Sequence, residues 1–402
     1  MGLLYLSLII FVLSILLLFY VFIGYPIIII IASKIFKTPL KKEPYFPKVT
    51  LLIPAFNEEE VIQKKIENTL SLNYPSDKLE IIVCDDASID NTNAIVKSFE
   101  GKGVILSDNK VRSGKVGGIN KALSIATGEI FVISDADIIL EADSLNELIY
   151  NFYDEKVGCV VAQTKMITKN SGESKSGGLY WKYEALIRES ESKLHSTVAA
   201  TGHLMGIRKK LLQKIPDSII LDDFYLCTLT MQQGYRVISE SKAIVWERPT
   251  TSMKDESNRR KRLTAGRYQI LFMWKVFLSK LNGLQKLQVI SHKFLRLAIP
   301  FFMITTFISN LYISIYTVTV KQNSLSQGFE NMTLFFLITQ ILFYIIAVVG
   351  WGVSKTGYTK SNITKWLTMP YYLCATNFSS VSGLFWYLSN KHSVLWQKAD
   401  RQ

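Results

Sequence analysis

Within the first half of the 402-residue chain stands the sequence Ile130-Phe131-Val132-Ile133-Ser134-Asp135-Ala136-Asp137, an apolar run that ends in two aspartates. Such a run, rich in β-branched residues, predicts a buried strand, and the polar residues mark its end. Where a strand breaks, two carboxylates spaced like Asp135 and Asp137 reach a common ligand. Magnesium and manganese ions take oxygen ligands and often bridge one or two carboxylates to substrate phosphates. The sequence therefore predicts that Asp135 and Asp137 hold Mg²⁺ or Mn²⁺.

Other apolar runs of strand length also end in polar clusters. Residues 49–53 lead into Pro54-Ala55-Phe56-Asn57-Glu58, and residues 79–84 lead into Asp85-Asp86. Helical patterns separate these runs, which predicts an α/β domain with a doubly wound, mostly parallel sheet. Because ligands of such sheets bind beyond the carboxyl ends of the strands, we expect the polar clusters to meet at one edge and form a site there.

The chain begins with an uncharged apolar segment, residues 3–31, that is long enough to span a bilayer. The segment is longer than the apolar part of a signal peptide, and no basic residue precedes it, so we predict a transmembrane helix. Lysines follow the segment instead, and positive charge stays on the cytoplasmic side of a membrane. The central domain is therefore expected in the cytoplasm. The lysines in question are Lys34, Lys37, Lys41, Lys42 and Lys48.

Apolar segments return in the C-terminal part. Residues 295–320 and 334–353 predict two membrane spans, whereas residues 366–388 are more polar and predict a third span or a re-entrant or interfacial helix. Residues 258–277 are basic on one side and apolar on the other, which fits an interfacial helix or an ordinary surface helix equally well. The predicted division is 1–33 transmembrane helix, 34–48 linker, 49–257 central domain, 258–293 interfacial helices, 294–390 membrane region and 391–402 basic tail.

The chain has a formal net charge of +13. Nucleic-acid binding is one explanation of such an excess, but no recognised nucleic-acid motif accompanies it, so we predict no nucleic-acid partner. Contacts of juxtamembrane lysines and arginines with anionic lipid explain the charge better. The four cysteines lie too far apart in the sequence for a zinc motif, and they fit a reducing cytoplasm.

Three more charged clusters are candidates for chemistry. Asp85-Asp86 suits hydrogen bonding to a nucleotide base or ribose, and a helix cap is the alternative. Asp222-Asp223 opens a predicted helix, where carboxylates are favoured in any case, and a general base that deprotonates a hydroxyl is the other interpretation. Arg259-Arg260-Lys261-Arg262 is the densest basic cluster. Its arginine forks suit a leaving diphosphate, and lipid headgroups are the alternative ligand.

In their order and spacing, these motifs resemble glycosyltransferase family 2, in particular its membrane-integrated branch. That branch contains the synthases of cellulose, hyaluronan, chitin and poly-N-acetylglucosamine, and the resemblance covers about residues 49–269. It implies a cytoplasmic catalytic domain of the GT-A type, flanked by transmembrane and interfacial helices. It also implies a nucleotide-sugar donor, expected to be a UDP-sugar, and a divalent metal ion.

The resemblance further implies a role for each matching position. Residues 53–59 look like the first nucleotide-binding segment of the family, and Gly114-Lys115 looks like the element near the diphosphate. Residues 201–208 resemble the acceptor-side segment. The implied donor-binding residues are Pro54, Ala55, Glu58, Asp86, Lys115, Asp135, Arg259 and Arg262; the implied acceptor-binding residues are Gly202, His203, Asp222 and Trp181; the implied catalytic base is Asp223.

One element departs from the family pattern. Processive members carry Gln-X-X-Arg-Trp on the interfacial helix, where this chain has Arg259-Arg260-Lys261-Arg262-Leu263. Arg262 is retained, but Arg259 replaces the glutamine and Leu263 replaces the tryptophan that floors the acceptor site. Trp181 and Trp246 are candidate substitutes for that tryptophan. The sequence therefore leaves processive synthesis and single transfer both open.

The leading prediction is an inverting transferase that extends a polysaccharide at the cell membrane of a bacterium or archaeon. One alternative is non-processive transfer of one sugar to a lipid-linked or glycan acceptor. The other is a non-catalytic membrane scaffold, against which the retention of Asp86, Asp135, Asp137 and Asp223 argues. The expected partners are a nucleotide-sugar donor, a glycan or lipid-linked acceptor, the lipid bilayer and, for an exported polymer, a secretion partner.

Overall fold

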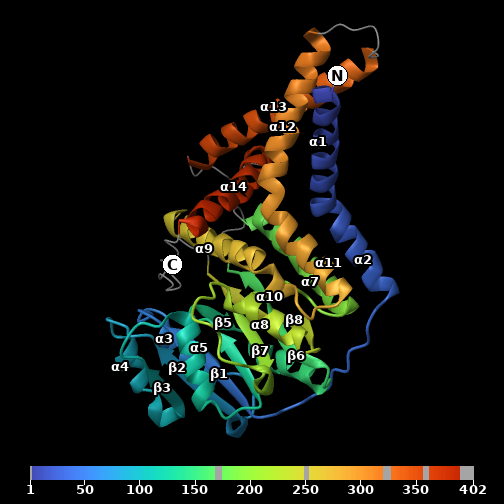
Figure 1. Cartoon of the computed structure of the whole chain (residues 1–402). Helices are drawn as coiled ribbons and strands as arrows, with labels where there is room; N and C mark the ends of the chain where they lie inside the picture. Colours follow the sequence, from blue (N-terminus) through green and yellow to red (C-terminus); the bar gives the residue numbers. More distant parts are fainter. Residues whose placement is uncertain (1, 168–173, 249–252, 320–326, 356–361, 390–402) are drawn as a thin grey trace.

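The computed structural model of the chain describes residues 2–167, 174–248, 253–319, 327–355 and 362–389. A domain built around a β-sheet occupies one end of the molecule, and long helices from both ends of the chain extend from it (Figure 1). The predicted basic tail, residues 391–402, lies outside the described residues.

The N-terminal helical segment is interrupted near its middle. It consists of α1 (Gly2–Phe19), a π-helical turn (Tyr20–Gly24) and α2 (Tyr25–Ile35). Pro26 in the first turn of α2 has no N–H to offer the carbonyl of Phe22 four residues earlier. The hydroxyl of Tyr183, on α7 (Ser174–Leu194), donates to that carbonyl instead at 2.9 Å. The segment therefore turns away from α1 toward the sheet domain, and α2 lies against α7 (Figure 1).

Eight strands form one sheet in the order β3-β2-β1-β4-β7-β6-β8-β5. Strands β1, β2, β3 and β4 pair with one another in parallel, as predicted. Strand β7 pairs antiparallel with both β4 and β6, and β5 pairs antiparallel with β8, so the C-terminal half makes the sheet mixed. The strands are β1 (Val49–Ala55), β2 (Leu79–Asp85), β3 (Val104–Asp108), β4 (Ile130–Ser134), β5 (Ile138–Leu140), β6 (Val157–Met166), β7 (Leu204–Arg208) and β8 (Arg236–Glu247).

The strand order brings the polar clusters together. β1 lies between β2 and β4, with Ala55 opposite Asp85 and Leu52 opposite Ile133. The loops that follow these three strands therefore leave the sheet at the same edge, which is where ligands of such sheets bind. The convergence expected from the sequence is present in the structure.

Two apolar cores hold the helices against the two faces of the sheet. Side chains alternate along β1, so that Leu51 and Ile53 face one core while Leu52 faces the other. The first core includes side chains of α3 and α6, and the second includes side chains of α5 and α8. The helices of the domain are α3 (Ile62–Leu70), α4 (Thr92–Lys97), α5 (Gly114–Ile125), α6 (Ser144–Ile149) and α8 (Asp222–Gln232).

Helix α9 (Met253–Phe272) lies between the sheet domain and the C-terminal helix α14 (Asn362–Leu388; Figure 1). On one side, the Gln269 side chain accepts from the backbone N–H of Ile220 at 3.0 Å and donates to the carbonyl of Ser218 at 2.7 Å. On the other side, the Tyr268 hydroxyl lies 3.2 Å from that of Ser380. The helix therefore joins the domain to the C-terminal helices. It begins earlier than the predicted helix 258–277 and gives way to the short α10 (Trp274–Leu278).

Three helical segments of the described residues are long and apolar enough to cross a membrane: Gly2–Ile35, Gly283–Thr319 and Gln327–Ser354. The second contains α11 (Gly283–Val289), a π-helical turn (Ile290–Phe294) and α12 (Leu295–Thr319), and the third lies within α13 (Gln327–Lys355). Helix α14 contains Pro370 and packs against α9 and α13. The predicted last segment, residues 366–388, lies within α14, which is not among these three segments of the described residues.

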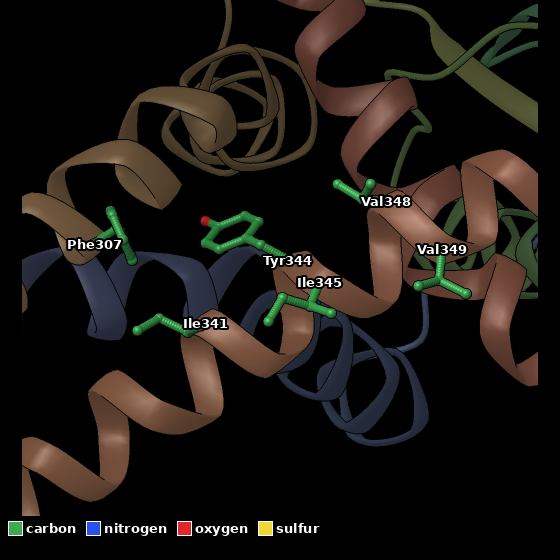
Figure 2. Close-up of a pocket in the computed structure, with 6 residues that line it drawn as sticks. All are labelled: Phe307, Ile341, Tyr344, Ile345, Val348 and Val349. Carbon is green, nitrogen blue, oxygen red and sulfur yellow. The ribbon is translucent and has the colours of Figure 1, made fainter.

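Figure 2 shows a cleft of about 350 Å³ between α12 and α13. Phe307 contributes from α12, and the other lining residues come from α13. The lining is almost entirely apolar and carries no charge, so the cleft does not suit a nucleotide sugar. The residues on α13 are Ile341, Tyr344, Ile345, Val348 and Val349.

Candidate active site

Lys115 stands at the centre of the polar edge of the sheet domain. Its Nζ lies 2.8 Å from Oδ1 of Asp135, at the end of β4, and 3.4 Å from Oδ2 of Asp222, in the first turn of α8. Burial alone would lower the pKa of Lys115, but the two carboxylates outweigh burial and hold its pKa above the usual value. The lysine therefore stays positively charged and links the Asp-X-Asp turn to α8.

Asp223 lies beside this cluster. A Cβ placed on Gly202 would lie 3.4 Å from Cβ of Asp223 and 3.6 Å from both Oδ2 of Asp223 and Nζ of Lys115. Burial and the neighbouring Asp222 raise the pKa of Asp223, and Lys115 opposes that rise. The backbone N–H of Phe224 donates to Oδ1 of Asp223 at 2.7 Å. Asp223 is thus a half-buried carboxylate with a raised pKa, which suits a general base.

The segment before β7 brings the predicted acceptor-side residues to the same place. Gly202 contacts the Asp223 region, and the carbonyl of His203 accepts from the backbone N–H of Asp135 at 3.2 Å. The ring of His203 points elsewhere: its Nδ1 lies 2.8 Å from the hydroxyl of Thr164 on β6, and its Nε2 lies 3.6 Å from Glu247 on β8. His203 therefore fixes the segment, and its backbone faces the Asp-X-Asp turn.

Arg259 projects from α9 toward the end of β8. Its Nη1 lies 3.1 Å from Oε1 of Glu247, the same buried carboxylate that lies near His203. Residues 259, 262, 266 and 269 recur at helical spacing, and Gly266 and Gln269 contact residues 218–221 of the domain. Arg262 therefore lies on the face of α9 that is turned toward the domain. The two predicted diphosphate-binding arginines share this face.

Asp86 is buried, and its carboxylate holds the start of α5. It accepts from Asn109 Nδ2 at 3.1 Å, from the N–H and hydroxyl of Ser113 at 2.7 and 2.9 Å, and from the N–H of Gly114 at 2.8 Å. Asp86 therefore accepts from N–H groups at the start of α5, whose N-cap residue is Ser113. Contact of Asp86 with a nucleotide base stays a prediction, and its observed contacts position Lys115, the next residue after Gly114.

The loops after β1 and β2 are hydrogen-bonded to each other. Pro54 and Ala55 are buried in β1, and the carbonyl of Ala55 accepts from the N–H of Asp86 at 2.9 Å. The backbone N–H of Glu58 donates to the hydroxyl of Thr92 at 2.8 Å. Asn57 has φ of 55°, a left-handed conformation that asparagine tolerates better than most residues. Hydrogen bonds to the loop after β2 therefore hold the predicted nucleotide-binding segment along one side of the site, and we call this segment the wall of the site.

Two residues at this wall were not anticipated from the sequence. The guanidinium of Arg112 lies 3.6 Å from the ring centroid of Phe56, which is a cation–π contact, and its Nε lies 4.0 Å from Asp86. Phe56 follows β1 directly and Arg112 precedes α5, so the pair links the first loop to the start of that helix. An aromatic residue immediately after a strand, in a polar loop, was the available signal.

Lys65 is a third residue that sequence reasoning missed. It projects from α3, is fully buried, and donates to Ser134 Oγ at 2.6 Å and to the carbonyl of Ile138 at 2.8 Å. These two acceptors lie on either side of the Asp-X-Asp turn in the sequence, so the two hydrogen bonds of Lys65 stabilise the turn. Burial lowers the pKa of Lys65 to about 7, against the opposing effect of Asp135 and Asp137. A lysine in an amphipathic helical pattern gives no hint of this position.

The two candidate substitutes for the missing tryptophan lie in different surroundings. Trp181 is half-buried on α7, one turn before Glu184, whose carboxylate binds α12. Trp246 lies on β8, and its indole N–H donates to Glu141 at 2.9 Å. Trp246 also pairs with Ile139 of β5, two residues after Asp137, so Trp181 and Trp246 both stay candidates for an acceptor contact.

Asp135 and Asp137 have the chemistry that a hard divalent ion needs. Both are partly exposed at the strand end, and carboxylate oxygens are preferred ligands of Mg²⁺ and Mn²⁺. Among the described residues, no three His, Cys, Asp or Glu side chains gather into a metal-binding group. The pair therefore fits a metal ion whose remaining ligands come from substrate phosphates and water.

Residues 50–216 match Glycosyl transferase family 2. This part of the chain is a family 2 glycosyltransferase domain. The match begins in β1 and covers the loops after β1, β2 and β4 together with the segment before β7. The family expected from the motif order is therefore confirmed.

Relatives of this glycosyltransferase carry transferase and synthase names. It is 26% identical over 380 residues to the probable glycosyltransferase YdaM of Bacillus subtilis. The alignment covers 88% of this chain and 87% of YdaM. It is 26% identical over 229 residues to the poly-beta-1,6-N-acetyl-D-glucosamine synthase of Staphylococcus aureus, covering 56% of this chain and 55% of the synthase. The chain thus matches only about half the length of that synthase.

A solved structure supports the fold over nearly the whole chain. The mannosyltransferase PcManGT from Pyrobaculum calidifontis, determined with GDP-Man and Mn²⁺, aligns with a TM-score of 0.71 and 23% identity. The alignment covers 95% of this chain and 100% of that one. The glycosyltransferase therefore has the expected α/β architecture of the GT-A type, with helices apolar enough to cross a membrane.

Proposed function

We propose that the protein transfers a sugar from a nucleotide-sugar donor to a hydroxyl of a growing polysaccharide at the cytoplasmic face of a cell membrane, with inversion at the anomeric carbon. One observation carries the proposal: Lys115 joins Asp135 to Asp222, directly beside Asp223 and Gly202. A donor-side motif and a candidate base thereby share one small site.

Asp223 is the proposed base. It accepts the proton of the acceptor hydroxyl while the hydroxyl oxygen bonds to the anomeric carbon and the bond from that carbon to the diphosphate breaks. Its raised pKa suits this task, because a more basic carboxylate takes a proton more readily. A single displacement of this kind inverts the configuration at the anomeric carbon.

The leaving nucleoside diphosphate gains negative charge, which the site is built to stabilise. Asp135 and Asp137 would hold Mg²⁺ or Mn²⁺, which neutralises the diphosphate when bound. Lys115 lies 2.8 Å from Asp135, and the proposed role of Arg259 and Arg262, on the face of α9 turned toward the domain, is to bind the diphosphate. The Phe56–Arg112 pair, next to the capped start of α5, offers a flat surface on which a nucleotide base stacks.

One residue bears on the number of sugars that are added to the acceptor. Leu263 stands where processive members of the family carry tryptophan. That replacement favours a second candidate function, transfer of one sugar to a lipid-linked or glycan acceptor. The similarity to a poly-N-acetylglucosamine synthase supports polysaccharide extension instead.

Product size separates the two. The purified protein in lipid vesicles is incubated with labelled nucleotide sugar, and the products are separated by length. Polysaccharide extension predicts long chains from the first turnovers onward. A product that stops at one added sugar would overturn extension and support the single-transfer function.

Replacing Asp222 with asparagine tests the assignment of the base through pH. The negative charge of Asp222 raises the pKa of Asp223, so its removal lowers that pKa. A base must be deprotonated to act, so kcat rises as pH rises through its pKa. We therefore expect the rising limb of the kcat–pH profile to move to lower pH in Asp222→Asn. Asp217→Asn, at an exposed position, serves as the control and leaves the limb in place; an unmoved limb in Asp222→Asn speaks against Asp223.

A further inference from the structure

A buried cluster of charged residues lies between the sheet domain and the membrane-side helices. It consists of Glu184 and Glu191 on α7, His292 in the π-helical turn before α12, and Arg296 on α12. His292 Nδ1 lies 2.7 Å from Glu191 Oε1, and its Nε2 lies 3.2 Å from Glu184 Oε2, while Arg296 binds Glu184. We call these four residues the junction cluster.

Glu191 is the member of this cluster that reaches the domain. It is completely buried, and its Oε1 accepts from His292 and from the hydroxyl of Tyr25 on α2. Its Oε2 accepts from the hydroxyl of Thr197 at 2.9 Å and from the N–H of Val198 at 3.2 Å. One carboxylate thus ties two membrane-side helices to the segment that follows α7.

That segment leads directly into the candidate active site. The Thr197 hydroxyl also accepts from the N–H of Ala199 at 3.2 Å, and the N–H of Thr197 donates to the carbonyl of Val237 on β8 at 2.9 Å. Residues 197–203 end with Gly202 and His203. Gly202 lies beside Asp223 and Lys115, and the carbonyl of His203 accepts from the N–H of Asp135. Only this short stretch separates Glu191 from the proposed base.

We propose that Glu191 and Thr197 are positioning residues that hold residues 197–203 against the acceptor side of the site, so that α2 and α12 set the geometry there. The proposal rests on the proposed function and adds a structural control to it. Burying charged groups costs free energy unless they are fully paired, and the Glu191 carboxylate is used completely, with two donors for each oxygen. The donors to Oε1 come from α2 and from the turn before α12, and the donors to Oε2 come from the segment after α7.

The test compares three threonine variants. Thr197→Val keeps shape but removes both side-chain hydrogen bonds, and Thr197→Ser restores them. Thr230→Val is the matched control, because Thr230 is also buried and its hydroxyl donates to the carbonyl of Leu226 in its own helix at 2.8 Å. Hydrogen exchange of residues 198–203 and binding of UDP with Mn²⁺ are measured for each variant, followed by transfer from the donor that the unaltered protein uses.

We expect faster exchange of residues 198–203 in Thr197→Val only, with binding of UDP and Mn²⁺ unchanged. Transfer should fall by about 10- to 100-fold, which is the cost of a small misplacement of reacting groups. Thr197→Ser should behave like the unaltered protein. Unchanged exchange in Thr197→Val would overturn the proposal, as would equal effects of Thr197→Val and Thr230→Val. Exchange and binding are read without turnover, so failure of the unaltered protein to use any nucleotide sugar would instead contradict the proposed function.

Discussion

Replacing Asp223 with asparagine is expected to lower the transfer rate by about 100- to 10,000-fold, the usual contribution of a general base. The substitution keeps the size of the side chain and removes its ability to take a proton. Because half-buried Asp223 lies beside Gly202 of the proposed acceptor segment, we expect binding of the nucleotide sugar to change little. The loss should appear in kcat, measured as release of nucleoside diphosphate in the presence of acceptor.

Asp217→Asn controls for loss of a carboxylate elsewhere, since Asp217 is exposed in the loop before α8. That variant should retain the activity of the unaltered protein. Near-normal kcat in Asp223→Asn would remove Asp223 as the base. A loss of donor binding as large as the loss of rate would show that Asp223 acts on the donor side instead.

The second large effect is expected from Asp137→Ala. The alanine variant removes one of the two carboxylates proposed to hold the divalent ion, and the diphosphate loses its counter-charge. We expect binding of the nucleotide sugar in Mn²⁺ to weaken by about 100-fold, because even residues that only orient metal ligands contribute 10- to 100-fold. Titration calorimetry with UDP, with and without Mn²⁺, measures the effect.

Asp143→Ala is the matched control for this variant. Asp143 is an exposed acid beyond β5, and its Oδ1 accepts from Nδ2 of Asn73 at 2.8 Å. Its replacement should leave the Mn²⁺ dependence intact. If Asp137→Ala binds UDP with the same affinity and the same Mn²⁺ dependence as the unaltered protein, the metal assignment is wrong.

The donor half of the fold could be predicted from the sequence because its strands are buried, continuous and parallel. The runs that end at Pro54, Asp85 and Asp135 each carry their polar cluster immediately after the apolar residues. Local pattern alone therefore placed the clusters at one edge, and the register of β1 with β2 and β4 agrees. The family followed from the order of these clusters.

The C-terminal half of the sheet was harder to predict. Strand β7 (Leu204–Arg208) is short, and its antiparallel pairing with β4 and β6 depends on long-range contacts that no local period reports. Strand β5 is shorter still, with three residues. The mixed character of the sheet could therefore not be derived from hydrophobic periodicity, whereas the parallel part could.

The residues that support the site were also hidden. In the sequence, nothing distinguishes Lys65 from other lysines in helices, yet in the structure it is fully buried and bonded to Ser134, next to the Asp-X-Asp turn. Glu191 and His292 lie about a hundred positions apart and meet only because α7 and the helix before α12 pack together. Buried charges of this kind are recognised only from their partners, which the fold supplies.

We expect the site formed by Asp135, Asp137, Lys115 and Asp223 to bind a nucleotide sugar and transfer its sugar. This expectation is tested most directly by incubating the purified protein in lipid vesicles with a panel of nucleotide sugars and measuring nucleoside diphosphate release with Mn²⁺ and with chelator. The account predicts turnover of at least one donor, expected to be a UDP-sugar, that depends on the divalent ion. Absence of turnover and of binding for every donor in the panel would contradict it.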